Sequence, residues 1–246
     1  MLLELKNVSF CVENEKAEER GSPLEIVRGI SFSLPENKFL VITGPNGGGK
    51  STLARLIMGI EMPTGGQIIF NGADITDMPV NGRAALGIGY AFQHPARFKG
   101  LTVRRLLELA HGAALAEDEC CSFLTKVGLC SMDYLNREVD ASLSGGELKR
   151  IEIATLMARD LSLAIYDEPE AGIDLWSFSM LVKSFKMMNK KNSRRSTIII
   201  SHQEKIMELA DEIIVIADGK IKSAGPREDI LPTLMDEFEK DCTFKH

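Results

Sequence analysis

The sequence lacks a long hydrophobic run. Of its 246 residues, 44% are hydrophobic and 26% are charged. Its most apolar stretches, residues 161–166 and 198–200, are far shorter than the ~18 apolar residues that a membrane helix needs. The first ten residues, MLLELKNVSF, offer neither a basic start nor a small-residue cleavage site, so no secretion signal is expected. We therefore expect a cytoplasmic protein with no direct membrane insertion.

An excess of positive charge is missing as well. The formal net charge is -6, whereas a protein that neutralises a phosphate backbone usually presents many lysines and arginines. We therefore expect no nucleic acid partner. The five cysteines form no C-x-x-C pair, and their odd number is typical of reduced thiols rather than of a disulfide framework or a zinc site.

What is present is an α/β pattern. Alternating apolar residues predict strands over Leu3–Val12 and 26–34, joined by an exposed charged loop over 13–22. The run Phe39–Thr43 predicts a buried strand, which a glycine loop and the helix Lys50–Met58 follow directly. From 102 to 160 the helical period dominates, which predicts an all-helical insertion. The remaining expected elements are strands over 67–71, 89–92, 161–166, 197–200, 213–217 and 220–224, helices over 173–189 and 203–209, and a helical tail from residue 226.

The first motif with chemical content is the glycine loop between strand and helix. It fits G-x-x-x-x-G-K-S, and in this context its backbone N–H groups and the positive helix end point at phosphates. Lys50 adds a positive charge there, and the Ser51 hydroxyl is placed to ligate Mg²⁺. The sequence therefore predicts a site for ATP and Mg²⁺. The predicted phosphate-binding residues are Gly44, Pro45, Asn46, Gly47, Gly48, Gly49, Lys50, Ser51 and Thr52.

A second motif is the carboxylate pair Asp167 and Glu168, which follows an apolar run. Such a pair is also an ordinary strand end. Downstream of a phosphate-binding loop in the same α/β domain, however, it lies where parallel sheets place their ligands, at the carboxyl ends of the strands. We expect Asp167 to reach the Mg²⁺ ion and Glu168 to polarise the water that attacks the γ-phosphate.

A third motif, LSGGE, opens a predicted helix at residues 143–147. Ser144 and Glu147 have the spacing of a capping box, which by itself explains them structurally. Gly145 and Gly146 leave the first N–H groups unobstructed, so the same helix end can form a second phosphate site. One chain cannot easily bring this helix over its own glycine loop, but two chains arranged head to tail can. The motif therefore predicts an ATP-dependent homodimer.

With these motifs in this order, the whole chain resembles the ATP-binding-cassette family. The resemblance implies a P-loop α/β fold with a mixed-sheet core, an antiparallel β subdomain and an inserted α-helical subdomain. It implies a single ATPase domain over 1–246, in which 1–101 and 161–246 form the nucleotide-binding core with its β subdomain, and 102–160 the helical signature subdomain.

The resemblance also implies roles for residues that are weak signals alone. Gln93 would contact the γ-phosphate and Mg²⁺ and report their presence to a partner-binding surface at residues 93–102. Asp174 matches the family's D-loop, and His202 its switch histidine, which would act with Glu168 and Lys50 in catalysis. Many relatives stack adenine on an aromatic residue where this chain has Val12, from which we expect an apolar contact.

Particular stretches resemble the SufC-type ATPases of iron–sulfur cluster assembly, above all their short archaeal form. They are NGADIT at 71–76, AFQHPARF at 91–98, LSGGELKRIE at 143–152 and DEPEAGID at 167–174. This implies a soluble SufB- or SufD-like scaffold as the partner. The alternative is the ATP-binding subunit of a transporter with a membrane permease as its partner. A non-catalytic ATP sensor is disfavoured because Glu168 and His202 are both present.

Overall fold

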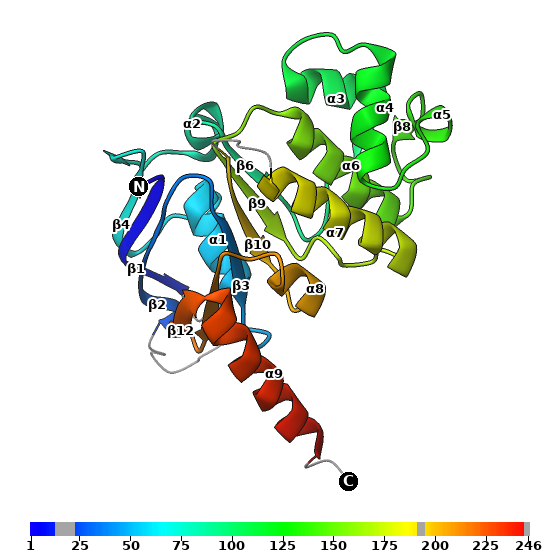
Figure 1. Cartoon of the computed structure of the whole chain (residues 1–246). Helices are drawn as coiled ribbons and strands as arrows, with labels where there is room; N and C mark the ends of the chain where they lie inside the picture. Colours follow the sequence, from blue (N-terminus) through cyan, green and yellow to red (C-terminus); the bar gives the residue numbers. More distant parts are fainter. Residues whose placement is uncertain (13–22, 191–194, 244–246) are drawn as a thin grey trace, which may run out of the picture.

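The protein is an α/β molecule built on a six-stranded mixed sheet (Figure 1). The computed structural model describes residues 1–12, 23–190 and 195–243, so the loop expected over 13–22 lies outside the described residues. Neighbouring strands from β11 to β6 are parallel, whereas β12 pairs with β11 antiparallel, and the expectation of a mixed core is confirmed. In spatial order the strands are β12 (Lys220–Pro226), β11 (Glu212–Ala217), β3 (Phe39–Thr43), β10 (Ser196–Ile200), β9 (Leu163–Asp167) and β6 (Ile88–Ala91).

A second, antiparallel sheet forms the predicted β subdomain. Its order is β2 (Leu24–Leu34), β1 (Leu3–Val12), β4 (Gly65–Phe70) and β5 (Ala73–Asp74). Its inner side chains share one hydrophobic core with helix α1 (Lys50–Met58) and with one face of the mixed sheet. The core therefore fixes α1, and with it the glycine loop, against both sheets.

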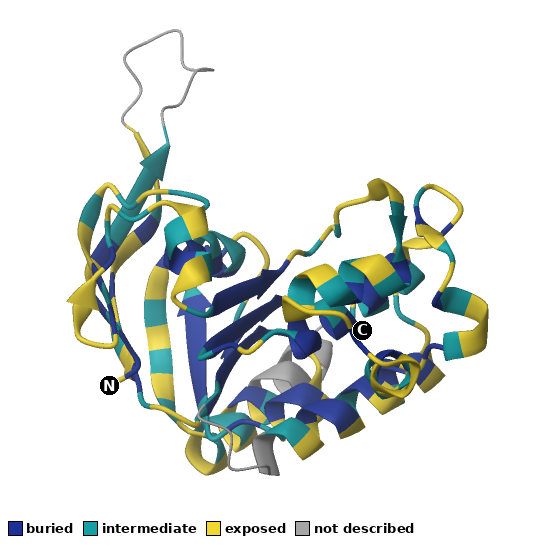
Figure 2. Cartoon of the chain, turned by 90° about the horizontal axis from the view of Figure 1, so that it is seen from above, coloured by how far each residue is buried: buried dark blue, intermediate teal, exposed yellow. Residues whose placement is uncertain are grey.

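Four central strands of the mixed sheet, β3, β10, β9 and β6, are buried at every position (Figure 2). In β3, Leu40 and Ile42 belong to the core around α1, whereas Phe39 and Val41 belong to a second core on the opposite face. Successive side chains of a strand point to opposite faces, so a strand covered on both sides is apolar at every position. This explains why FLVIT is an unbroken apolar run.

The second core joins the mixed sheet to the helical part of the molecule. The helices there are α3 (Val103–His111), α4 (Glu117–Lys126), α5 (Ser131–Tyr134), α6 (Gly145–Ala158) and α7 (Leu175–Lys190). The expectation of an all-helical insertion over 102–160 is wrong, because β7 (Phe98–Thr102) pairs with β8 (Glu138–Val139) beside α3. A two-residue strand is too short to show alternation in the sequence.

The remaining helices are α2 (Val80–Ala85), α8 (Glu204–Met207) and α9 (Arg227–Thr243). The sequence analysis missed α2 because VNGRAA has no apolar stripe. Its anchor is Arg83, which is fully buried and donates to the carbonyls of Leu56, Ile57, Thr76 and Met78. Within the described part of the chain, no helix is both long and apolar enough to cross a bilayer.

Candidate nucleotide-binding site

The predicted phosphate-loop, magnesium and catalytic residues meet at the carboxyl ends of four neighbouring strands. The glycine loop follows β3, His202 comes two residues after β10, Asp167 ends β9, and Gln93 comes two residues after β6. These strands are adjacent and parallel in the order β3, β10, β9 and β6. Residues far apart in the sequence are therefore brought to one edge of the sheet, where ligands of parallel sheets bind.

The glycine loop wraps back on Lys50. The Lys50 ammonium donates to the carbonyl oxygens of Gly44 at 2.7 Å and Pro45 at 2.9 Å. Burial lowers the pKa of Lys50, and the carboxylates of Glu168 and Asp167 oppose that shift. Gly44 has φ +127°, and a Cβ there would lie 2.0 Å from the Ile216 carbonyl oxygen, so this position requires glycine.

Asp167 is held from two sides. Ser51 Oγ donates to Asp167 Oδ1 at 2.9 Å, and the Tyr90 hydroxyl donates to Oδ2 at 2.7 Å. Asp167 is 1% exposed. Burial and the adjacent carboxylate raise the pKa of Tyr90, so its hydroxyl keeps its proton and remains a donor. Tyr90 was missed by the sequence analysis, because nothing in the sequence shows that β6 lies next to β9.

Glu168 lies at the turn that leaves β9. Its φ is +46°, a left-handed value that is uncommon for a residue other than glycine, and its N–H donates to the Ile200 carbonyl at 3.0 Å. The Gln93 amide donates to Glu168 Oε2 at 2.7 Å. The turn and the glutamine together fix where the catalytic candidate points.

His202 has an unused nitrogen at this edge. Its Nε2 is buried and has no hydrogen-bond partner among the described residues. Burial lowers the pKa of His202, nearby Lys50 lowers it further, and Glu168 raises it. A neutral ring with a free nitrogen can hydrogen-bond a group that enters the site.

Most of the glycine loop, together with Gln93 and Glu168, lines a cleft of about 470 Å³. Val12 is not among its lining residues, and the apolar contact expected from Val12 stays a prediction. The apolar wall comes from Leu24 and Ile26 on β2, and Val12 pairs with Leu24 across the ladder. No sequence signal distinguished the two strands. The lining residues are Leu24, Ile26, Asn46, Gly47, Gly48, Gly49, Lys50, Ser51, Thr52, Gln93 and Glu168.

The LSGGE segment does not line this cleft. Ser144 and Glu147 form the expected capping box at the start of α6. The Glu147 carboxylate also accepts from the Tyr134 hydroxyl and pairs with Arg137 at 3.9 Å, so its own chain already uses it. At Gly145, in contrast, a Cβ would meet nothing within 4 Å, so the helix end is open.

The D-loop lies against the LSGGE segment of the same chain. A Cβ at Gly146 would lie 2.4 Å from the Gly172 carbonyl oxygen, so the two backbones are in close contact. Asp174 accepts hydrogen bonds from the N–H groups of Trp176 at 3.1 Å and Ser177 at 3.0 Å. Its carboxylate therefore caps the start of α7 in this chain and does not line the cleft.

The sequence analysis also missed Lys149, which joins α6 to the site. Lys149 is 1% exposed. Its ammonium donates to the carbonyl oxygens of Phe92 and Asp167, the latter at 2.9 Å. Burial lowers the pKa of Lys149, and the surrounding carboxylates oppose that shift. A lysine on a helix is usually read as solvent-exposed, so its position gave no signal.

The fold and this site define an ATP-binding-cassette ATPase, an enzyme that hydrolyses ATP. Residues 27–171 match the family model described as ABC transporter, and the chain belongs to this family. It is 40% identical over 227 residues to an uncharacterized ABC transporter ATP-binding protein of Methanocaldococcus jannaschii, covering 89% of this chain and 88% of the relative.

Two further comparisons fit this family. The chain is 33% identical to a sulfate/thiosulfate import ATP-binding protein of Synechocystis, covering 83% of this chain and 57% of the relative. Among solved structures, a bacterial ABC transporter cassette in dimeric form matches with a TM-score of 0.80 at 21% identity, over 92% of this chain and 99% of that one. At that identity the structural match supports the fold.

Proposed function

We propose that this chain is the ATP-hydrolysing subunit of an ABC transporter, which pairs with a second copy around ATP and drives a membrane permease. One observation carries the proposal. The cleft gathers the glycine loop, Gln93 and Glu168, while the open helix end at Gly145 lies outside it. A nucleotide in the cleft would thus be contacted by the glycine loop of this chain. Its other side would remain accessible to the α6 end of a second copy.

Within the cleft, the residues fit Mg-ATP. The N–H groups of the glycine loop and the end of α1 bind the phosphates, and the Lys50 ammonium turns to them from its own loop carbonyls. Ser51 Oγ and Asp167 Oδ1, 2.9 Å apart, are the oxygen donors that Mg²⁺ prefers alongside substrate phosphates. Bound Mg²⁺ would neutralise charge that develops on the phosphate oxygens. Gln93, on the same cleft wall, completes the proposed phosphate and metal contacts.

Glu168 is the proposed base. Its carboxylate, held by the turn after β9, accepts the proton of the attacking water. Gln93 holds Glu168 Oε2 until the γ-phosphate offers the amide another partner. His202 donates from its unpartnered Nε2 to the γ-phosphate and thereby positions it against the water.

The second copy contributes its α6 end. Gly145 and Gly146 form the first turn of α6, at the positive helix terminus, which favours an anion. Docked head to tail, this terminus closes on the γ-phosphate held by the first copy. Hydrolysis cleaves the bond to the γ-phosphate, and release of that phosphate removes the charge that bridges the two copies, so they separate. This cycle drives the partner through differential affinity for its conformations.

The partner proposed is a membrane permease rather than a soluble cluster scaffold. The short stretches around residues 71, 91, 143 and 167 favoured the scaffold, but the relatives reported above are named as ABC transporter ATP-binding and import proteins. We place the chain on the cytoplasmic side of the membrane, where ATP is available. Residues 93–102 remain the proposed surface that contacts the permease.

Purification from the native cells tests the choice of partner. The tagged chain is isolated once without detergent and once after solubilisation of the membranes. Recovery of a polytopic permease only in the second preparation supports the transporter. Recovery of a soluble scaffold protein in the first preparation, with no permease in either, would contradict the transporter proposal and support a role in iron–sulfur cluster assembly.

A further inference from the structure

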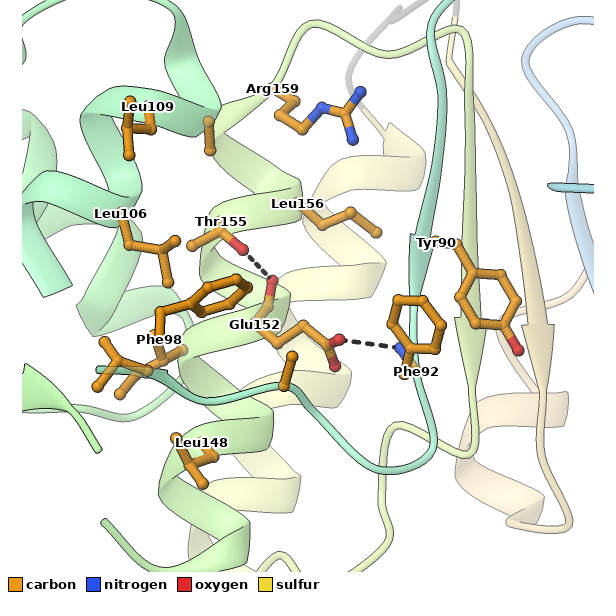
Figure 3. A pocket seen from close by; sticks show the side chains of 14 residues that line it. Tyr90, Phe92, Phe98, Leu106, Leu109, Leu148, Glu152, Thr155, Leu156 and Arg159 are labelled. Atoms are coloured by element: carbon orange, nitrogen blue, oxygen red, sulfur yellow. Dashed lines mark hydrogen bonds between the residues drawn. The ribbon is translucent and has the colours of Figure 1, made fainter. Parts of the chain in front are cut away.

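A groove of about 560 Å³ lies between α6 and the segment that joins β6 to β7 (Figure 3). Its walls are apolar and open to solvent: Phe92 and Phe98 are each 42% exposed, and Leu109 is 53% exposed. Exposed apolar side chains gathered around a hollow are typical of a surface that binds another protein. The groove adjoins residues 93–102, the proposed contact with the permease.

A carboxylate lies within this apolar lining. Glu152 Oε1 accepts a hydrogen bond from the Phe92 N–H at 3.0 Å, as Figure 3 shows. The other oxygen, Oε2, is buried and has no hydrogen-bond partner within the described ranges. A buried carboxylate oxygen without a donor costs free energy. Half of this group therefore lacks a donor in the described part of the chain.

The cations nearby direct their hydrogen bonds elsewhere. Lys149 donates to the carbonyl oxygens of Phe92 and Asp167. Arg159 also lines the groove, and it donates to the Ala84 carbonyl at 3.3 Å. Neither of these cations donates to Glu152 Oε2.

We propose that Glu152 determines the specificity of this groove by selecting a permease segment that carries one arginine or lysine among apolar residues. The apolar side chains cover Phe98 and Leu109, and the cation donates to Glu152 Oε2. This inference rests on the proposed function, which requires a partner. A charge-assisted hydrogen bond between apolar walls is stronger than one in water, so a single carboxylate discriminates between segments.

The position of Glu152 links the groove to the catalytic site. Its Oε1 holds the N–H of Phe92, and the next residue, Gln93, donates to Glu168. A cation bound at Oε2 therefore lies on the same short chain of contacts as the proposed base. An occupant that shifts Glu152 also shifts the start of the Gln93 segment.

A peptide selection tests the proposal. The full chain is used as bait for a phage-displayed library of random helical peptides. Glu152→Gln is screened in parallel, because it keeps the size and the acceptor for Phe92 but removes the carboxylate charge. Glu36→Gln, an exposed position between β2 and β3, is the charge-matched control. Leu109→Asp places a charge in the groove lining, so it should weaken the binding of any peptide that occupies the groove. Thermal melting checks the folding of each variant.

Peptides recovered with the wild-type chain should carry arginine or lysine among apolar positions. A recovered peptide should bind wild type and Glu36→Gln at least about tenfold more tightly than its norleucine twin, and this difference should vanish for Glu152→Gln. No recovered peptides, no basic preference, equal discrimination by Glu152→Gln, or binding insensitive to Leu109→Asp would each overturn the proposal. ATP hydrolysis and ATP-dependent pairing, measured without peptide, test the proposed function separately.

Discussion

The Gln93 side-chain amide donates to Glu168 Oε2 at 2.7 Å, across the cleft edge between β6 and β9. The Gln93 amide is the donor and the Glu168 carboxylate is the acceptor. The contact joins the residue that begins the proposed partner-binding segment to the residue proposed as base. The position of the Glu168 carboxylate is therefore linked to the proposed partner-binding segment through one hydrogen bond.

Glu168→Gln should abolish turnover while ATP binding persists. The substitution keeps the shape and an acceptor for Gln93 but cannot take a proton, so the hydrolysis rate should fall by about 10²- to 10⁴-fold. Phosphate release and retention of a fluorescent ATP analogue are measured on the same preparation. Turnover at the wild-type rate would refute the role given to Glu168.

Tyr90→Phe should weaken the Mg²⁺ site. It removes the hydroxyl that donates to Asp167 Oδ2 and leaves a buried carboxylate oxygen unpaired. We expect a loss of about 1–3 kcal/mol in the free energy of unfolding. We also expect an increase of about tenfold in the Mg²⁺ concentration for half-maximal ATPase activity. Urea unfolding and Mg²⁺ titration of the ATPase rate measure the two effects.

Tyr166→Phe is the matched control on the neighbouring strand. Its hydroxyl is buried without a hydrogen-bond partner in the described structure, so its removal leaves nothing unpaired. Its stability should change by less than about 0.5 kcal/mol, or increase. Equal losses in both variants would mean that the hydrogen bond to Asp167 does not account for the effect of Tyr90→Phe.

Ionisation of the buried Glu152 carboxyl should lower the free energy of unfolding as the pH rises. Burial raises the pKa of Glu152 from 4.5 to about 7, although the Phe92 N–H and Lys149 oppose the shift. Between these values the folded state holds a proton that the unfolded state has released, so the free energy of unfolding falls with increasing pH, by at most about 1.4 kcal/mol per unit. Glu152→Gln lacks this loss.

Urea unfolding of wild type and Glu152→Gln across the same interval measures the difference. The stability of the variant relative to wild type should grow as the pH rises from 4.5 to about 7 and then level off. A constant difference between wild type and Glu152→Gln would show that the Glu152 carboxyl titrates as it does in the unfolded chain.

Much of the fold could be predicted because burial leaves a pattern. The run Phe39–Thr43 is apolar at every position since both faces of β3 are covered, and Gly59 ends α1 in a left-handed conformation, as the sequence suggests. Helix α2 and strand β8 could not be predicted. The first is held by the buried Arg83 rather than by apolar residues, and the second is too short to alternate.

The site was predictable where one segment carries the chemistry. The glycine loop and the Asp167–Glu168 pair are each contiguous, so their spacing indicates their use. Tyr90, Lys149 and the Leu24 wall contribute through tertiary neighbours, and only the order of the strands and the docking of α6 bring them to the cleft or its carboxylate.

The central claim is that the helix end at Gly145 acts on a nucleotide held by the other copy. Gly145→Asp tests it in the Glu168→Gln background. A Cβ at Gly145 meets nothing within 4 Å, and a carboxylate suits a helix N-terminus, so the fold should tolerate the change. The new charge would repel a γ-phosphate that approaches the helix end. Gly145→Asn is the neutral control of equal size.

Sedimentation with saturating Mg-ATP, together with nucleotide binding to the dilute monomer, is the deciding measurement. We predict that Gly145→Asp binds the nucleotide as a monomer with unchanged affinity but fails to dimerise, whereas Gly145→Asn dimerises. If Gly145→Asp instead lowered the ATP affinity of the isolated monomer, the helix end would act within its own chain. A dimer that formed equally well with aspartate at this position would likewise contradict the account.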